Sequence, residues 1–304
     1  MKKLLKQCAR GLAQTFVFGL IYGTAHAMPV GIASGQPSGT NYPMATDIAR
    51  VCSTPQSPIT NVQSDGSLDN LAKVYGDKNV QYGIVQTDAL VYQQGVDPKM
   101  MDRIQMVFPF FSSEIHLVVR ANSPINGLAD LQGKKVDEDV EGSGSWVSVQ
   151  VIKSLTGYRW NAVNLQQAQG LQAVQSGAVD AMFVNAGRPV SMLSSASGVK
   201  LVSIANPKLD EFGLYTKSTI PSGSYPFQQQ SVQTYKTGNV LVTYAFKNQY
   251  QKEIGALVTC VMHNLPELQR TGHPKWKNVD PTDIERIKWQ VHPSALAAIR
   301  KGSK

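Results

Sequence analysis

The stretch VGIASGQPSGTNYP, residues 30–43, decides the fold. Its apolar opening, Val30–Ser34, predicts a strand, and a glycine-rich turn then leads into a helical pattern from about Pro43 to Val51. The same order recurs twice, because the predicted strands Ile59–Gln63 and Val80–Gln86 also lead through polar residues into helices. Such alternation predicts βα units on a largely parallel sheet, an α/β fold.

A second α/β half begins after Ser123. Its predicted strands and helices are Lys135–Asp137, Trp146–Leu155, Asn161–Leu165, Ala168–Gln175, Asp180–Val184 and Val199–Ile204. The predicted strand Ile115–Arg120 leads into this half. The turn-rich segment Ile220–Lys236 is predicted to be a connection outside the core. The chain then returns to the first half through a predicted strand, Val240–Phe246, and a predicted helix, Gln249–Met262. We therefore expect lobe I at 28–118 plus 238–304 and lobe II at 119–237, with a ligand cleft between them.

Residues 1–27 have the layout of a secretory signal peptide. A basic opening without acids precedes a mostly apolar run from Gly11 to Tyr22, and Ala25-His26-Ala27 supplies an A-x-A cleavage signal. The run is shorter than the roughly 20 apolar residues of a spanning helix, so a membrane anchor fits less well. We expect cleavage after Ala27 and export of the mature chain.

The charge of the chain excludes several classes of partner. The 304 residues carry 29 Lys+Arg and 21 Asp+Glu, a net charge of +8, and removal of Lys2, Lys3, Lys6 and Arg10 lowers it to +4. No basic run with interleaved aromatic residues occurs, so we expect no nucleic-acid partner. No later apolar stretch is long enough to span a bilayer, and we expect a soluble, monomeric mature protein.

Two cysteines, Cys52 and Cys260, remain after cleavage. An even count in an oxidising compartment permits one disulfide. Two separately buried thiols fit the sequence equally well, because free cysteine packs like a small apolar residue.

Three strand-to-helix turns carry residues suited to ligand binding. They are Gly35–Pro43, Ser64-Asp65-Gly66-Ser67 and Gly142-Ser143-Gly144-Ser145. Glycine permits close approach of the backbone, hydroxyl groups donate and accept hydrogen bonds, and the free N–H groups at a helix start favour an anion. Any one turn is equally explained as a helix cap, but three of them in a two-lobed exported chain point to a carboxylate ligand.

Motifs of enzymes and metal sites are missing from the sequence. Neither a phosphate-binding glycine motif nor a G-x-S-x-G nucleophile turn occurs, and the histidines show no paired metal spacing. Glu114 and His116 share one strand face, where a hydrogen-bonded hinge pair is favoured over a metal pair. We expect no enzymatic activity, no cofactor and no metal.

In its three glycine-rich turns and in the strand that carries Glu114 and His116, the sequence resembles the TAXI family of extracytoplasmic solute receptors, which serve TRAP-type transporters. The similar motifs run in order along the chain: Gly39-Thr40-Asn41-Tyr42-Pro43 (G-T-x-Y-P), Ser64–Leu71 (T-G-G-S-x-x-N-L), Gly83–Asp88 (G-I-V-Q-S-D), Glu114–Val119 (E-x-H-L-V-V), Gly142–Ser145 (G-S-G-T), Ser222–Pro226 (A-G-T-Y-P) and His292–Ala295 (H-P-G-A). The resemblance covers about residues 30–300.

The resemblance implies a two-lobed periplasmic-binding-protein fold, type II-like, that closes on a small carboxylate such as glutamate, a dicarboxylate or a 2-oxo acid. Carried over by position, the ligand contacts are Gly39, Thr40, Asn41, Tyr42, Ser67, Gln86, Thr87, Asp88, Ser143, Gly144, Ser145 and Tyr225. Core packing for Tyr42 and helix capping for Asp88 are the alternatives.

Two segments depart from the family pattern. An acidic run, Glu138-Asp139-Val140-Glu141, precedes the third turn, where the family is usually rich in glycine and proline. Such a run is typical of a solvated rim, or else Glu141 or Asp139 faces a ligand amine. Arg188 follows a predicted strand and is a candidate to clamp a ligand carboxylate, with an exposed surface arginine as the alternative. If Arg188 and Glu141 both face the cleft, an amino acid fits better than a dicarboxylate.

The sequence thus predicts a periplasmic solute-binding protein that delivers a small carboxylate or amino acid to the membrane subunits of a TRAP permease. A sensory accessory that presents its closed form to a membrane receptor is the first alternative. An exported hydrolase is the second, because a Ser-His-Asp triad is recognised by geometry and not by sequence order.

Overall fold

A computed structural model describes residues 29–245 and 251–302. The predicted signal peptide, residues 1–27, lies outside the described residues. Among the helices that are described, none combines the length and the apolar character needed to cross a membrane.

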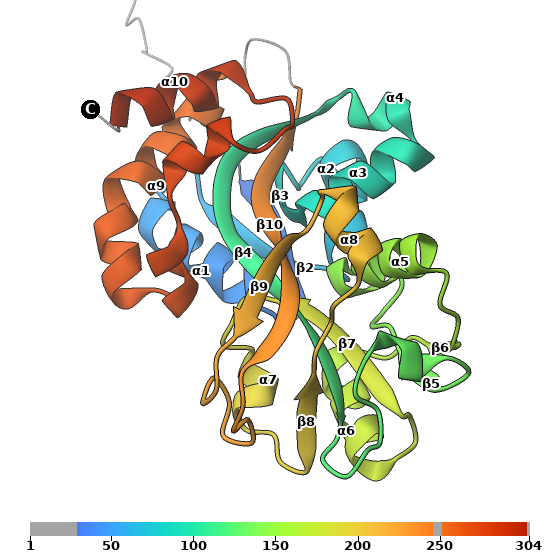
Figure 1. Cartoon of the computed structure of the whole chain (residues 1–304). Helices are drawn as coiled ribbons and strands as arrows, with labels where there is room; N and C mark the ends of the chain where they lie inside the picture. Colours follow the sequence, from blue (N-terminus) through green and yellow to red (C-terminus); the bar gives the residue numbers. More distant parts are fainter. Residues whose placement is uncertain (1–28, 246–250, 303–304) are drawn as a thin grey trace, which may run out of the picture.

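The first lobe is built from the two ends of the chain. Its strands and helices are β1 (Val30–Gly35), α1 (Asn41–Cys52), β2 (Ile59–Gln63), α2 (Ser67–Gly76), β3 (Tyr82–Gln86), α3 (Thr87–Val96), α4 (Pro98–Met101), α9 (Gln251–Thr271), η3 (Pro274–Asn278), η4 (Pro281–Glu285) and α10 (Pro293–Gly302). Helix α9 packs against α1 and α10 beside the sheet (Figure 1). The strand–turn–helix order read from residues 30–96 is the order observed.

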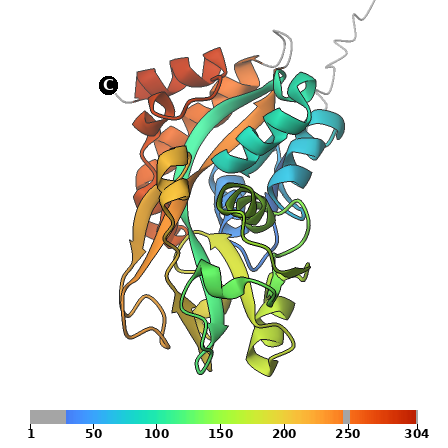
Figure 2. The same cartoon turned by 45° about the vertical axis from the view of Figure 1, so that its right-hand side comes forward.

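The second lobe holds the middle of the chain. Its elements are η1 (Leu128–Leu131), β5 (Lys135–Asp137), α5 (Gly144–Thr156), β6 (Asn161–Val163), α6 (Gln167–Ser176), β7 (Ala181–Ala186), α7 (Ser191–Ser194), β8 (Val199–Val202), α8 (Pro207–Phe212) and β9 (Thr216–Ile220). Helix α5 lies against α3 of the first lobe and α8 of its own, so it stands at the junction of the two (Figure 2).

Two long strands, β4 (Ile104–Arg120) and β10 (Val232–Tyr244), run through both lobes (Figure 1). The strands of the sheet follow the order β2-β1-β3-β10-β4-β7-β5-β6, in which β10 and β4 pair antiparallel with each other. Strands β1, β2 and β3 pair in parallel, as do β5, β6 and β7. Every strand pairing that involves β4 or β10 is antiparallel, including those with β8 and β9, and the remaining pairings are parallel.

The hydrophobic core changes along these two strands. Side chains up to Phe111 on β4 and from Val240 on β10 pack in the first lobe, whereas those from Ile115 on β4 and up to Tyr235 on β10 pack in two clusters of the second lobe. The residues between these positions connect the lobes.

Two sequence-based predictions about these strands are wrong. β4 begins at Ile104, well before the predicted Ile115, and Val232–Lys236 is the first part of β10 and not a connection. Thr234 and Tyr235 are buried there, since this part of β10 pairs with β9 and with β4. The preceding glutamines and the Pro-Ser-Gly turn obscured a strand whose β-branched and aromatic residues favour extended structure.

Cys52, at the end of α1, and Cys260, on α9, are joined by a disulfide with a Cα–Cα distance of 5.9 Å. The bridge ties the C-terminal helices to the first βα unit across 208 positions of sequence. It lies within the first lobe, away from the turns that carry the predicted ligand contacts.

Candidate functional site

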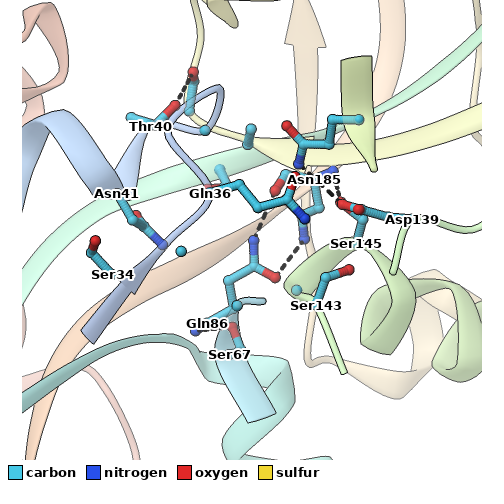
Figure 3. A pocket seen from close by; sticks show the side chains of 18 of the residues that line it. Ser34, Gln36, Thr40, Asn41, Ser67, Gln86, Asp139, Ser143, Ser145 and Asn185 are labelled. Atoms are coloured by element: carbon cyan, nitrogen blue, oxygen red, sulfur yellow. Dashed lines mark hydrogen bonds between the residues drawn. The ribbon is translucent and has the colours of Figure 1, made fainter. Parts of the chain in front are cut away.

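A small cavity of about 60 Å³ lies between the lobes, at the carboxyl ends of the parallel strands. Its lining comes from six segments at strand ends and one crossing strand: Ser34, Gly35, Gln36, Gly39, Thr40 and Asn41; Asp65, Gly66 and Ser67; Gln86; Ser113; Asp139, Ser143, Gly144 and Ser145; Gln167; and Asn185, Ala186 and Gly187. Figure 3 shows their side chains converging from both lobes. Ligand sites in α/β proteins occupy this position.

Four helices begin at the cavity, one of them α6 at Gln167. α1 starts at Asn41, α2 at Ser67 and α5 at Gly144, and the first N–H groups of an α-helix have no partner within the helix. Ser143 caps α5 by accepting a hydrogen bond from Trp146 N–H. The helix starts place donors and positive dipole ends around the cavity, an environment that favours an anion.

The lobes touch each other around this cavity. Thr40 Oγ1 donates to the Gly187 carbonyl oxygen at 2.8 Å, and Gln86 Nε2 donates to the Asn185 carbonyl oxygen at 3.0 Å. Leu68 N–H donates to the Gly142 carbonyl oxygen at 2.9 Å. A Cβ on Gly66, which has φ +122°, would stand 2.9 Å from Ser143 Cα, so the second turn needs glycine at this close approach.

Asp139 brings a buried carboxylate to the cavity. It is 1% exposed and adopts φ +70°, a left-handed conformation that is unusual for a residue other than glycine. Burial raises the pKa of Asp139 to about 6, against hydrogen bonds from Gln167, Val140 N–H, Ser145 and Ser143 that lower it. At neutral pH the group is therefore largely ionised, and it is aligned by Gln167 Nε2 at 3.0 Å.

The acidic run is not a solvated rim. Asp137, Glu138 and Asp139 are all buried, and only Glu141 is exposed. Glu138 accepts from Lys153 Nζ at 2.8 Å and from Trp160 Nε1, so its charge is compensated inside the second lobe. Of the two acids considered for a ligand amine, Asp139 lines the cavity and Glu141 does not.

The structure brings most of the predicted contacts together. Gly39, Thr40, Asn41, Ser67, Gln86, Ser143, Gly144 and Ser145 line the cavity. Tyr42, Thr87, Asp88, Arg188 and Tyr225 do not. Tyr42 is half-buried on α1, and Thr87 Oγ1 lies 2.8 Å from Thr237 Oγ1. The side chains of Thr87, Asp88, Arg188 and Tyr225 are held by neighbouring protein groups.

Asp88 belongs to a buried link between lobes. Its carboxylate accepts hydrogen bonds from Ser148 on α5 and from Tyr215 Oη, the latter at 3.0 Å. Burial raises the pKa of Asp88 to about 6, and both hydroxyls oppose that shift. Ser148 Oγ also accepts from Asn185 Nδ2 at 2.7 Å, so the link ends at the cavity wall.

Arg188 and Tyr225 support the crossing strand β4 from behind the cavity. Arg188 Nη2 lies 3.7 Å from Glu114 Oε1, and buried Lys275 Nζ lies 3.1 Å from Glu114 Oε2. Tyr225 Oη is 2.8 Å from His116 Nε2 and accepts from Val190 N–H. His116 Nδ1 lies 2.8 Å from the Glu114 carbonyl oxygen, so the expected pair is hydrogen-bonded through the backbone, while the two side chains have different partners. The condition of Arg188 and Glu141 both facing the cleft is not met.

Several lining residues were missed from the sequence. Ser34, Gln36, Ser113, Gln167 and Asn185 line the cavity without having been proposed as contacts. Asn185 was accessible to prediction, because it stands directly after the predicted strand Asp180–Val184. Ser113 was not, because the part of β4 that contains it was not expected to be a strand.

The charged side chains that line the cavity are acidic. Among the described residues that line it, none is lysine, arginine or histidine, and Asp65 and Asp139 are the acids. Nor do three or more His, Cys, Asp or Glu side chains gather in a metal-binding group anywhere in the part of the chain that is described. Any anionic group bound here is held by helix starts and hydroxyl groups.

Comparison with protein families matches residues 32–300 to the model of the NMT1-like family. The chain belongs to the NMT1-like family. Matches to solved structures of similar fold also cover most of the chain. One, from work on glutathione import via GshT and the cystine ABC importer TcyBC of Streptococcus mutans, is 12% identical with a TM-score of 0.54, and the match covers 84% of this chain and 98% of that one.

Two further structures resemble the NMT1-like protein to the same degree. A structure described as a periplasmic transporter is 15% identical, covers 93% of this chain and 98% of its own, and has a TM-score of 0.54. The periplasmic binding protein BugD is 12% identical, with coverage of 90% and 93% and a TM-score of 0.54. At these identities the likeness shows the fold, which is the two-lobed fold of periplasmic binding proteins.

Proposed function

We propose that this NMT1-like protein is a periplasmic solute-binding protein that captures a small carboxylate and delivers it to the membrane subunits of a TRAP-type transporter. The observation that carries the proposal is the cavity between the lobes, where the starts of α1, α2 and α5 meet. A carboxylate is the anion that such helix starts and hydroxyl groups accommodate, since no basic side chain among the described lining residues competes for that role.

The size and position of the cavity support capture of a small solute. Its volume of about 60 Å³ is far below the several hundred Å³ typical of sites for drug-sized ligands. The direct hydrogen bonds Thr40–Gly187 and Gln86–Asn185 join the two sides of the cavity. Opening of the lobes, proposed as 28–118 plus 238–304 and 119–237, breaks these bonds and admits the ligand, a hinge motion that ligand binding reverses.

The transporter type and the cellular location rest on the sequence. The ordered motifs from residue 30 to 300 resemble TAXI receptors, and residues 1–27 resemble a signal peptide. The mature protein is proposed to act as a monomer in the periplasm, where it docks on the permease with its ligand enclosed. Amino acids, dicarboxylates and 2-oxo acids are the ligand classes to be compared.

The test is thermal unfolding of the mature protein, refolded to remove any retained solute, against a panel of these three classes. A solute at 100 times its Kd stabilises the fold by about 2.7 kcal/mol if it binds only the folded state. We expect such a shift from one class and, with a co-expressed TRAP permease, uptake of the same solute. Absence of a shift from every carboxylate contradicts the binding proposal, whereas binding without uptake contradicts the transport role and favours the sensory alternative.

A further inference from the structure

Asp139 is a buried carboxylate with no cation beside it. In residues 29–245 and 251–302, no Lys, Arg or His nitrogen lies within the 4.0 Å of an ion pair with this carboxylate, although its neighbour Glu138 is paired with Lys153. A buried charge is costly without a partner. Asp139 faces the cavity, and its backbone is held in the left-handed region by Asn164 Nδ2, which donates to the Asp139 carbonyl oxygen at 2.8 Å.

Three amide oxygens at the cavity also lack a donor, those of Asn41, Gln167 and Asn185, and the last two belong to buried residues. Gln167 is 8% exposed and Asn185 is 5% exposed, and in the structure neither Gln167 Oε1 nor Asn185 Oδ1 has a hydrogen-bond partner. The amide orientations follow from the other end of each group: Gln167 Nε2 donates to Asp139 Oδ2, and Asn185 Nδ2 donates to Ser148 Oγ. Buried acceptors of this kind are normally satisfied, so these two indicate a donor supplied by a ligand.

We propose that Asp139, Gln167 Oε1 and Asn185 Oδ1 receive the ammonium group of the ligand, so that the solute bound here is a small α-amino acid and not a dicarboxylate or a 2-oxo acid. This inference rests on the proposed function and narrows it. An ammonium group is donor-only with three N–H bonds, which matches one carboxylate and two amide oxygens. The ligand carboxylate takes the helix starts on the other side of the cavity.

The charge of the cavity supports a zwitterion over a doubly charged anion. Helix starts contribute partial positive charge, and Asp139 contributes a full negative charge, so a ligand with one ammonium and one carboxylate matches both. A dicarboxylate brings its second negative charge into a lining that has no basic side chain among the described residues. A 2-oxo acid replaces the donor by a carbonyl acceptor and leaves Gln167 and Asn185 without partners.

The experiment compares matched pairs that differ only at this group, by isothermal titration of the refolded mature protein. The probes are L-alanine with pyruvate, L-serine with glycerate, and L-glutamate with 2-oxoglutarate. We expect the amino member of at least one pair to bind at least tenfold more tightly than its partner. In Asp139→Asn that preference is expected to fall at least tenfold, with the affinity for the partner acid unchanged or increased.

Two further variants separate recognition from folding. Asparagine tolerates the left-handed region, so Asp139→Asn keeps the backbone of the turn. Gln167→Leu removes one acceptor at the start of α6 and is expected to weaken the amino acid more than its partner acid. Glu141→Gln removes the exposed acid of the same run and is expected to leave both affinities unchanged.

The outcomes distinguish the inference from the function on which it rests. Partner acids or dicarboxylates that bind as tightly as the amino acids overturn the inference and leave the solute-binding function in place. An unchanged preference in Asp139→Asn also overturns it. If no carboxylate of any class binds, the proposed function fails and the inference fails with it.

Discussion

The hydroxyl of Thr40 donates to the carbonyl oxygen of Gly187 at 2.8 Å, although 147 positions of sequence separate the two residues. Thr40 stands at the start of α1 in the first lobe, and Gly187 follows β7 in the second. Gly187 has no room for a side chain, because an added Cβ would lie 2.5 Å from Phe111 and 2.9 Å from the Thr40 methyl carbon. The pair therefore fixes how closely the lobes approach.

Replacement of Thr40 by valine keeps the shape and removes the donor. The Gly187 carbonyl oxygen then loses this buried partner, at a cost of about 1–3 kcal/mol. Because the bond joins the lobes, the same free energy predicts roughly 5- to 150-fold weaker binding of the tightest solute found in the panel, measured by isothermal titration. Thr60→Val, on the exposed face of β2, is the control, and equal affinity in both variants contradicts a closing role for Thr40.

Gly144→Ala tests the contact between α5 and the end of β3. An added Cβ would lie 2.0 Å from Gln86 Oε1, and Gln86 cannot move aside without breaking its hydrogen bonds to Asn185. We expect at least a tenfold loss of ligand affinity in isothermal titration, with a folded protein by circular dichroism. Gly95→Ala is the matched control, because Gly95 is also helical and has open space at its Cβ. A Gly144→Ala protein with wild-type affinity would show that the lobes need not approach this closely.

The sequence predicted the parallel parts of the sheet well, because each short apolar strand is followed by a turn and a helix that are read locally. It did not predict the lengths of β4 and β10. Their pairing is set by partners far away in the chain: Leu241, for example, lies opposite both Phe108 and Ile84. Such non-local pairing overrides the local signal of the glutamine-rich segment before Val232.

The parts of the candidate site that are formed by glycine-rich turns could be predicted from the sequence. The prediction was poorer for ligand contacts that were proposed because of the charge of a side chain. Arg188 was proposed because arginine clamps carboxylates, yet it lies beyond the end of β7 at Ala186. Asn185, which is still on β7, lines the cavity, whereas Arg188, two positions past the strand, contacts Glu114. Asp88 stands in the first turn of α3, where the sequence placed it, but its carboxylate meets Ser148 and Tyr215 and does not line the cavity.

Tyr225→Phe separates a supporting role from ligand contact. The Tyr225 hydroxyl lies 2.8 Å from His116 Nε2 and accepts from Val190 N–H, so its removal leaves two buried groups unpaired. We expect the free energy of unfolding to fall by about 1–3 kcal/mol in urea titration, with ligand affinity within about twofold of wild type. Tyr75→Phe, at a position that is half exposed, is expected to change neither quantity. A tenfold loss of affinity in Tyr225→Phe, in a protein of normal stability, would instead make Tyr225 a ligand contact.

The buried link at Asp88 predicts an unusual dependence of stability on pH. Burial raises the pKa of Asp88 in the folded protein to about 6, above its ordinary value of 3.8, so the folded state holds this proton more tightly than the unfolded state. The contribution of Asp88 to stability is therefore greatest below pH 4 and is lost as the pH rises through 6. Asp137 and Asp139, also with pKa values near 6, act in the same direction.

His116 acts in the opposite direction, because burial lowers its pKa to about 4 and its contribution is lost as the pH falls from 6.5. The effect of Asp88 is isolated by comparing Asp88→Asn with wild type in urea titrations between pH 4.5 and 7.5. Asparagine stays neutral, so the stability of wild type relative to the variant is expected to rise by about 2 kcal/mol as the pH falls across this range. Asp102→Asn, at an exposed position, is expected to keep the wild-type profile. A pH profile of Asp88→Asn that runs parallel to wild type would show that Asp88 keeps an ordinary pKa, with water reaching the junction of α3 and α5.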